Sequence, residues 1–518
     1  MGSRLTPLSR ILIVIGIVAG AYFGGRYLLN NTSFGEKIKS QSTSSSSAND
    51  DEGSSSDDKD VIKVGVVTWP GYAGGQYFNE GFKANTTSRY FKDYGFKVEF
   101  KVLDDFEASR AAWKKGDVDL LWCTIDALPT EMAALADFEP KVVFQADWSR
   151  GGDAVVVRRG ILKVADLRGK KIAVAEMTPS HSFLLWLLEA GGLSVKDVQI
   201  VPQPNAIDAA SVFKSQQVDA AVVWSPDDAD CVKSVPGARI LESTKSASNI
   251  IADAFIAKKS FIDSHETRLQ QLYEGWMQGA AEINSSDVNK RKAAKILSQA
   301  FDGFSEADMY SALGNVRLAT HGDNKNFFGL NPSYKGVKAE ELYGRMAEVY
   351  KSLGFAQGKV PSWRLASNPI AISSTDLAGV SHQGEGQKSF ATISQNEAAG
   401  KEAVATKRVS ITFRSGEFAL DENAKYIVDK EMVSIAKAFS NARIRIEGNT
   451  DNVGDRESNL SLSQKRAQSV ANYLVGTYGM PRNRFIVIGN GPDNPVADNA
   501  TDAGRNKNRR TDFELISE

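Results

Sequence analysis

Aromatic and acidic side chains occur directly after several predicted strands in the central part of this 518-residue chain. In an open α/β sheet, ligands bind in the crevice beyond the carboxyl ends of the strands, so residues at these positions are candidates for a solute site. They are Trp69, Tyr72, Trp122, Thr124, Asp126, Ser149, Asp153, Thr178, Ser180, His181, Trp224 and Asp227. Tryptophans and aspartates prevail in this set, with Arg150 as the one arginine beside them, which favours a cation held by aromatic faces and carboxylates.

The same residues leave other interpretations open. Small hydroxyl groups and helix N-termini suit an anion, and the tryptophans are equally compatible with packing in a hinge or a core. We favour an amine-containing solute over an anion. His181 stands at a predicted helix start, where a histidine is more often a cap or a ligand contact than a general base. No spacing indicates a Ser/His/Asp set, so the sequence predicts a binding protein without catalytic residues rather than an enzyme.

The elements that must position these side chains alternate between strand and helix over residues 61–355. Predicted strands at 62–67, 96–103, 117–123 and 141–148 are separated by helical stretches, and a second series follows at 170–176, 198–203 and 219–224. Such alternation predicts mainly parallel sheets flanked by helices. Segments 151–160 and 250–262 are interpreted as crossings between two lobes, which is the architecture of a hinged clamshell.

Three segments of this region resemble a known family. They are WSRGGDAVVV from Trp148, VADLRGKKIAVAEMTPSHSFLLWLLEAGGLSVKDVQIV from Val164, and QQVDAAVVWSPD from Gln216. Together they resemble the nitrate/sulfonate/taurine type of ABC-transporter substrate-binding protein. The resemblance implies a type II periplasmic binding fold, but it does not identify the solute. Delivery of the solute to an ABC permease is one alternative for its role.

The last part of the chain, residues 408–518, contains five spaced motifs. Val409, Ile411 and Phe413 alternate as a strand, and a helix with an apolar side follows. The run NTDNVG from Asn449 is then followed by NLSLSQKRA, GNGPDNP and NRR. In this order the motifs resemble the OmpA C-terminal-like, peptidoglycan-associated domain, with Asn449 standing where that family has a histidine. The resemblance implies an α+β domain that binds peptidoglycan.

In that family an Asp and an Arg hold the diaminopimelate of the peptide stem. The matching positions here are Asp451, which would take the ammonium, and Arg466, which would take the carboxylate; Asn459, Thr450 and Leu462 lie alongside. A zwitterion does need one acceptor-only carboxylate and one planar donor fork. The alternative is that Asp451 and Arg466 form a plain surface ion pair. Arg509 and Arg510 are expected to be structural or to face the wall.

The N-terminus combines a basic start with an apolar run. Residues 11–29 are predicted to be a transmembrane helix, and Arg4 and Arg10 place residues 1–10 in the cytoplasm and the bulk of the chain in the periplasm. A cleaved signal peptide is the alternative, because Ala19-Gly20-Ala21 resembles a cleavage site. Small residues at Gly16, Gly20 and Gly24 can pack two such helices into a homodimer. A Ser/Asp-rich flexible linker is expected over 30–60, and a second linker over 356–407, part of it docked on the preceding lobe.

The overall composition limits the remaining functions. A net charge of -1 argues against nucleic-acid binding. Two cysteines and four histidines lack the spacing of a metal site, so no metal or cofactor is expected. The sequence therefore predicts a protein of the bacterial inner membrane that crosses it once, binds a small solute in its cleft and binds peptidoglycan noncovalently. The alternative is an envelope scaffold or stator-like sensor, whose lobes regulate wall attachment without transport.

Overall fold

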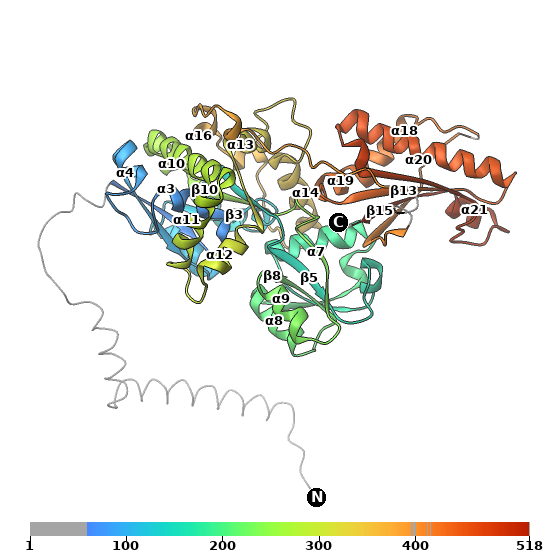
Figure 1. Ribbon diagram of the computed structural model, residues 1–518, viewed down its shortest axis with the longest axis horizontal. Helices are drawn as coiled ribbons and strands as arrows, with labels where there is room; N and C mark the ends of the chain where they lie inside the picture. The colour runs from blue at the N-terminus through green and yellow to red at the C-terminus, as the bar shows by residue number, and fades with distance from the viewer. Residues whose placement is uncertain (1–59, 395–396, 398–399, 412, 415, 517–518) are drawn as a thin grey trace, which may run out of the picture. The chain divides into compact units, whose positions relative to one another are not determined.

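The computed structural model describes residues 60–394, 397, 400–411, 413–414 and 416–516 (Figure 1). The predicted transmembrane helix at 11–29, the segment 1–10, the glycines Gly16, Gly20 and Gly24 and nearly all of the linker 30–60 lie outside the described residues. Among the described residues, no helix has both the length and the apolar character of a membrane span.

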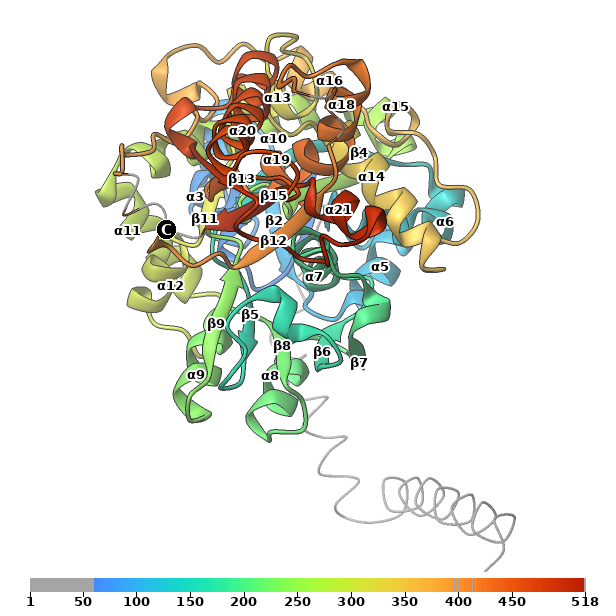
Figure 2. The same ribbon diagram turned by 90° about the vertical axis from the view of Figure 1, so that its right-hand side faces the viewer.

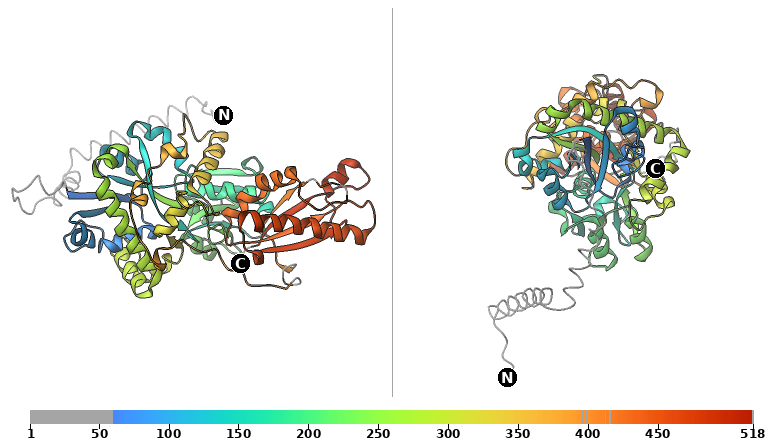
Figure 3. Two further views of the ribbon diagram at one scale, coloured as in Figure 1. Left: turned by 90° about the horizontal axis from the view of Figure 1, so that it is seen from above. Right: turned by 90° about the vertical axis from the view of Figure 1, so that its left-hand side faces the viewer.

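A mixed sheet of six strands forms the first lobe, in the order β11-β4-β10-β3-β1-β2. Its strands are β1 (Val61–Val66), β2 (Lys97–Val102), β3 (Leu120–Thr124), β4 (Pro140–Ser149), β10 (Ala252–Lys258) and β11 (Val316–Leu318). β1 is parallel to β2 and β3, whereas β10 and β11 are antiparallel to their neighbours. Figure 3 shows the blue and cyan strands of this sheet with helices around them.

The first lobe contains most of the helices of this region. They are α3 (Ala73–Phe78), α4 (Arg89–Tyr94), α5 (Phe106–Lys115), α6 (Met132–Leu135), α10 (Lys259–Ser285), α11 (Asp287–Ser298), α12 (Glu306–Ala312), α13 (His321–Phe327) and α14 (Ala339–Ser352). α3 and α10 approach closely because glycines face each other: a Cβ atom at Gly279 would lie 2.2 Å from the carbonyl oxygen of Gly74. This approach holds Trp276 of α10 completely buried in the core.

The second lobe contains a sheet of five strands in the order β7-β6-β8-β5-β9 (Figure 2). The strands are β5 (Asp153–Val157), β6 (Lys171–Ala175), β7 (Gln199–Gln203), β8 (Ala220–Trp224) and β9 (Arg239–Ser243), and the helices are α7 (Pro179–Ala190), α8 (Ala206–Lys214) and α9 (Asp227–Ser234). α7 is apolar nearly all round, which matches its burial. The cysteines Cys123 and Cys231 lie in different lobes as buried, free thiols.

The two-lobed α/β architecture is confirmed, but two details of the prediction are wrong. The sheets are mixed rather than mainly parallel, and the segments interpreted as crossings contain strands: β5 belongs to the second sheet and β10 to the first. The chain passes between the lobes just before each of these strands, from β4 to β5 and from β9 to β10. A strand that enters a sheet from the neighbouring lobe runs against the strands already there, so β5 and β10 are antiparallel to their neighbours.

The C-terminal domain contains a sheet of four strands in the order β12-β15-β13-β14. Its elements are β12 (Ala405–Val409), α18 (Glu422–Val428), a π-helical turn (Asp429–Val433), α19 (Ser434–Ala438), β13 (Arg443–Asn449), α20 (Arg456–Tyr478), β14 (Phe485–Gly491), α21 (Asp502–Asn508) and β15 (Thr511–Ile516). β13 and β14 are parallel and α20 connects them, so this is an α/β domain rather than the predicted α+β domain. The predicted strand at 409–413 is also wrong, because the observed strand ends at Val409.

Part of the segment 356–407 packs on the first lobe. It contains the short helices α15 (Trp363–Ala366) and α16 (Ile370–Ser373). The ring of Trp363 lies 5.5 Å from that of Phe328 and 5.7 Å from that of Tyr343, and the amide of Asn368 donates to the carbonyl oxygen of Val142 at 2.9 Å. This part therefore completes the first lobe.

Candidate functional site

A small space, the interlobe cavity, lies where the two lobes meet. Its volume is about 40 Å³, and it is lined by Val67, Thr68, Trp69, Tyr72, Trp122, Thr124, Asp153, Pro179, Trp224, Ile251 and Asp253. Six of the predicted solute-site residues are among them: Trp69, Tyr72, Trp122, Thr124, Asp153 and Trp224. β1 and β3 with the turns after them supply the first-lobe side, while β8 and the start of α7 supply Trp224 and Pro179. Closure of the lobes therefore brings aromatic side chains from both sheets to one place.

Two aspartates that the sequence analysis missed stand beside this cavity. Asp147 on β4 and Asp253 on β10 lie opposite each other in the antiparallel register of these strands. The hydroxyl of Tyr72 donates to Asp253 Oδ1 at 2.7 Å, and the indole of Trp69 donates to Asp147 Oδ2 at 3.2 Å. Each aspartate interrupts an apolar run, in FQADW and IIADAF, and this interruption is the signal that would have identified them.

The predicted Asp126 and Asp153 extend this group to four buried carboxyl groups. The exposed fraction is 0% for Asp126 and Asp147, 3% for Asp153 and 5% for Asp253. Ser149 Oγ donates to Asp153 Oδ2 at 2.8 Å. Among the described residues, none donates a well-formed hydrogen bond to either carboxylate oxygen of Asp126 or to Asp153 Oδ1. The group thus presents acceptor oxygens that the protein itself leaves available.

Burial sets the charge state of these carboxyl groups. Loss of hydration raises the pKa of Asp126 to about 7 and that of Asp153 to about 7, and it also raises the pKa values of Asp147 and Asp253. Within the part of the chain that the structure describes, no lysine, arginine or histidine lines the cavity. A cation that entered would lower these pKa values and take the place of the missing counter-charge.

Other predicted residues have local roles. Ser180 Oγ accepts a hydrogen bond from the indole of Trp224 at 3.0 Å and so orients that ring. Thr178 donates to the carbonyl oxygen of Ala175 at 2.7 Å. His181 Nδ1 accepts from the backbone of Met177 at 3.2 Å, and burial lowers its pKa to about 4. Thr178, His181 and Asp227 do not line the interlobe cavity.

A second candidate site, the C-terminal hollow, lies in the C-terminal domain and encloses about 790 Å³. All five residues predicted to bind the peptide stem line it, namely Thr450, Asp451, Asn459, Leu462 and Arg466. The loop after β13 carries Thr450 and Asp451, and α20 carries the other three. Asp455 caps α20 by accepting a hydrogen bond from the Ser458 amide, which fixes where this helix begins.

The charged groups of the hollow do not form the pair that was considered as the alternative. Asp451 Oδ2 is bonded to Arg509 Nη1, and Asp451 Oδ1 accepts from the Val453 amide at 3.2 Å. Arg466 Nε donates to the carbonyl oxygen of Glu417 at 3.0 Å, and the guanidinium lies 4.8 Å from the ring centre of Phe413. Burial, followed by the charge of Arg509, lowers the pKa of Arg466, whereas Asp451 raises it.

The charged residues that line this hollow are one carboxylate, that of Asp451, and four arginines, Arg466, Arg505, Arg509 and Arg510. Arg466 bonds here to backbone carbonyl groups, so its charge is available to an incoming carboxylate. Arg510 differs, because its guanidinium donates to both oxygens of Asp512, at 3.0 and 2.9 Å, inside the domain. Asn449, which stands where the resembling family has histidine, donates to Asp512 Oδ2 at 3.3 Å. The arrangement suits a ligand end that carries both an ammonium and a carboxylate.

Comparison with known families matches two parts of the chain. Residues 81–286 match the NMT1/THI5-like family, and residues 412–509 match the OmpA family. Outer membrane porin F of Pseudomonas aeruginosa is 33% identical over 127 residues, which cover 24% of this chain and 36% of that protein. Peptidoglycan-binding protein ArfA of Mycobacterium tuberculosis is 42% identical over 90 residues, which cover 17% of this chain and 27% of that protein. The chain thus matches well under half the length of these relatives.

The chain is also similar to solved structures. The periplasmic aliphatic sulphonate binding protein SsuA from Escherichia coli is 18% identical, with a TM-score of 0.48, over 65% of this chain and 97% of that one. The desulfurization enzyme DSZB is 16% identical, with a TM-score of 0.41, over 61% of this chain and 98% of that one.

Proposed function

We propose that this chain, in which an NMT1/THI5-like periplasmic binding domain precedes an OmpA-like peptidoglycan-binding domain, captures a small cationic solute while its C-terminal domain holds the cell wall. The observation that carries the solute class is the group of Asp126, Asp147, Asp153 and Asp253, buried beside an aromatic cavity. The protein acts by binding and performs no catalysis.

An ammonium ion satisfies the interlobe cavity better than an anion does. When ionised, these buried carboxylates attract a cation and repel a sulfonate or phosphate. Trp69 and Trp224 line the cavity and can add cation–π attraction, whereas the ring of Trp122 already has the Arg110 guanidinium 4.5 Å from its centre. An anion would instead require the basic side chains or unpaired backbone amides that anion sites contain. The cavity volume of about 40 Å³ favours a compact cationic group.

A thermal-shift screen of the full chain tests this solute class. The panel contains methylated ammonium ions and small diamines, alkanesulfonates, inorganic phosphate and divalent metal ions. We expect at least one amine to raise the melting temperature, because a ligand that binds only the folded state stabilises it. Stabilisation by sulfonates alone, or by metal ions alone, would contradict the proposed class.

The C-terminal hollow supports noncovalent binding of the wall peptide. In this proposal Arg466 takes the carboxylate of diaminopimelate and Asp451 takes its ammonium, and both residues line the hollow. Arg509 holds Asp451 until the ligand enters. The matched segment of the peptidoglycan-binding protein ArfA agrees with this role.

The location and partners follow from the same proposal. Residues 11–29 anchor the chain in the bacterial inner membrane, with residues 1–10 in the cytoplasm and the domains 61–355 and 408–518 in the periplasm. Gly16, Gly20 and Gly24 are the contact face if two anchors pair. An ABC permease receives the solute in the transport version of this function. In the sensor version, the lobes control wall attachment instead.

A further inference from the structure

The C-terminal domain contacts both lobes through separate sets of polar groups. With the second lobe, the Val164 amide donates to the carbonyl oxygen of Val404 at 2.8 Å, and Lys407 Nζ lies 3.4 Å from Glu189 Oε1. The amide of Asn249, in the connection that returns to the first lobe, donates to the carbonyl oxygen of Ala438 at 3.0 Å. The domain is thus attached to the moving lobe and to its hinge segment.

The contacts with the first lobe come from α14 and the segment before it. Lys437 Nζ lies 3.0 Å from Glu341 Oε2, and Arg345 Nη1 donates to Ser434 Oγ at 3.0 Å. Lys335 Nζ donates to the carbonyl oxygen of Thr477 at 2.8 Å. One domain therefore bridges the two halves of the clamshell.

Glu189 of α7 joins all three parts at one point. Its carboxylate accepts from Arg345 of the first lobe and from Lys407 of β12, and Lys407 also lies 3.1 Å from Glu431. Burial opposes ionisation of Glu189, but Arg345 and Lys407 outweigh it and lower its pKa below the ordinary value. The carboxylate is therefore charged and pairs with cations from two different parts of the protein.

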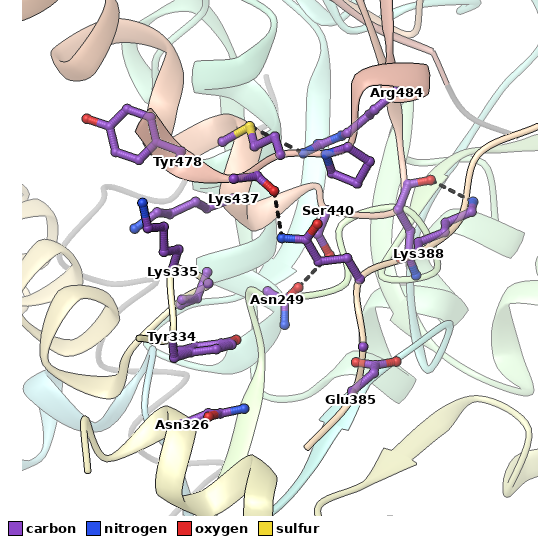
Figure 4. Close-up of a pocket in the computed structure, with 18 of the residues that line it drawn as sticks. Asn249, Asn326, Tyr334, Lys335, Glu385, Lys388, Lys437, Ser440, Tyr478 and Arg484 are labelled. Atoms are coloured by element: carbon purple, nitrogen blue, oxygen red, sulfur yellow. Dashed lines mark hydrogen bonds between the residues drawn. The ribbon is translucent and has the colours of Figure 1, made fainter. Parts of the chain in front are cut away.

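The interface between the C-terminal domain and the first lobe is only partly filled. It encloses a cavity of about 760 Å³, and Figure 4 shows Lys335, Tyr334 and Glu385 on one side with Lys437 and Tyr478 on the other. Polar interfaces between domains of one chain resemble transient protein–protein interfaces, so relative motion of the two domains is expected. None of the residues that make these polar contacts lines the C-terminal hollow, so docking leaves the hollow open to the wall.

We propose that docking of the C-terminal domain across both lobes holds the solute cleft closed. Opening of a clamshell rotates one lobe away from the other. A single domain cannot keep both sets of contacts during this rotation, so opening must break one of them. Because coupling is reciprocal, a solute that stabilises closure also stabilises docking, and an empty cleft releases the domain. This device would link solute capture to the position of the wall-binding domain, whatever the solute is.

Distances measured by spin labels in the full chain test the proposal. Ala111→Cys and Ser211→Cys are exposed sites that report the separation of the lobes, and Ala111→Cys with Asn423→Cys reports docking. The two native cysteines are buried. Lys437→Glu breaks the ion pair with Glu341 of the first lobe, and Lys407→Glu breaks the ion pair with Glu189 of the second. The matched control is Lys425→Glu, which disrupts an exposed pair within the C-terminal domain.

We expect Lys437→Glu or Lys407→Glu to shift both distance distributions to longer values, with no shift in the control. Adding Glu341→Lys to Lys437→Glu should restore both distributions, because the ion pair is rebuilt with reversed charges. The proposal is overturned if the docking distance lengthens while the lobe distance stays the same. It is equally overturned if neither variant shifts either distribution.

Discussion

The interlobe cavity has a volume of about 40 Å³ and lies beside four buried carboxyl groups, whereas the C-terminal hollow has a volume of about 790 Å³ and is lined by four arginines and one carboxylate. In the cavity, no lysine, arginine or histidine among the described residues lines the walls, and burial raises the pKa values of the carboxyl groups. In the hollow, Asp451 already has a partner in Arg509. The difference teaches that the first site selects a ligand by the sign of its charge, and the second by the spacing of two opposite charges.

The largest effect is expected from substitution of the two residues of the hollow that are proposed to bind diaminopimelate. Arg466→Ala or Asp451→Ala should abolish pull-down by purified peptidoglycan, since a zwitterion loses half of its recognition in either variant. Arg482→Ala and Asp493→Ala remove exposed charges outside the hollow and serve as matched controls that should bind normally. Undiminished binding by both the Arg466→Ala and the Asp451→Ala variants would refute the role assigned to the hollow.

The cavity should respond to pH in a way that the hollow does not. The pKa values of Asp126 and Asp153 are raised to about 7, so raising the pH through this value creates the charges that a cation needs. Affinity for an amine found in the screen should therefore rise by up to about tenfold per pH unit below pH 7 and then level off. Titration calorimetry at several pH values measures this. An affinity that is independent of pH would argue against carboxylate binding.

A smaller effect is expected on the stability of the solute-free protein. A carboxyl group whose pKa is higher in the folded state stabilises the fold fully below its ordinary pKa of 3.8, and this contribution is lost as the pH rises through about 7. Asp126→Asn removes the cost of a buried charge. Above pH 7 the free energy of unfolding of the variant should therefore exceed that of the natural protein by on the order of 1 kcal/mol. Denaturant unfolding at pH 8 and pH 5 measures this difference.

The expected pattern has its own control at low pH. At pH 5 less of the stabilisation from the raised pKa has been lost than at pH 8, so the difference in stability between the two proteins should be smaller there. The same variant should bind the amine more weakly at pH 8, which separates a site residue from one that only stabilises the fold. A loss of stability at pH 8 would contradict the account.

Sequence reasoning identified the aromatic side of the cavity but only half of its carboxyl groups. Trp69, Tyr72 and Trp224 follow or end strands, where the rule for open sheets places ligands. Asp147 and Asp253 lie within strands that connect the lobes, and their proximity arises from pairing between segments far apart in the chain. No pattern in a single sequence contains that register.

The hollow was predicted more completely because its residues occur in spaced motifs. Thr450, Asp451, Asn459, Leu462 and Arg466 all line it. The bond between Asp451 and Arg509 was not predicted, since it depends on how α21 ends beside the loop after β13. The side chains of Thr178 and His181 were assigned to the cleft because they stand at a helix start. That helix is buried on nearly all sides, and both side chains make hydrogen bonds to neighbouring backbone groups instead.

The central claim is that the interlobe cavity recognises positive charge. It is tested most directly by comparing the affinity of the best amine from the screen with that of its uncharged isostere of the same shape. The account predicts that the amine binds the natural protein at least about tenfold more tightly, equivalent to ~1.4 kcal/mol, and that Asp153→Asn reduces this difference. Equal binding of the two compounds, with no effect of Asp153→Asn, would contradict it.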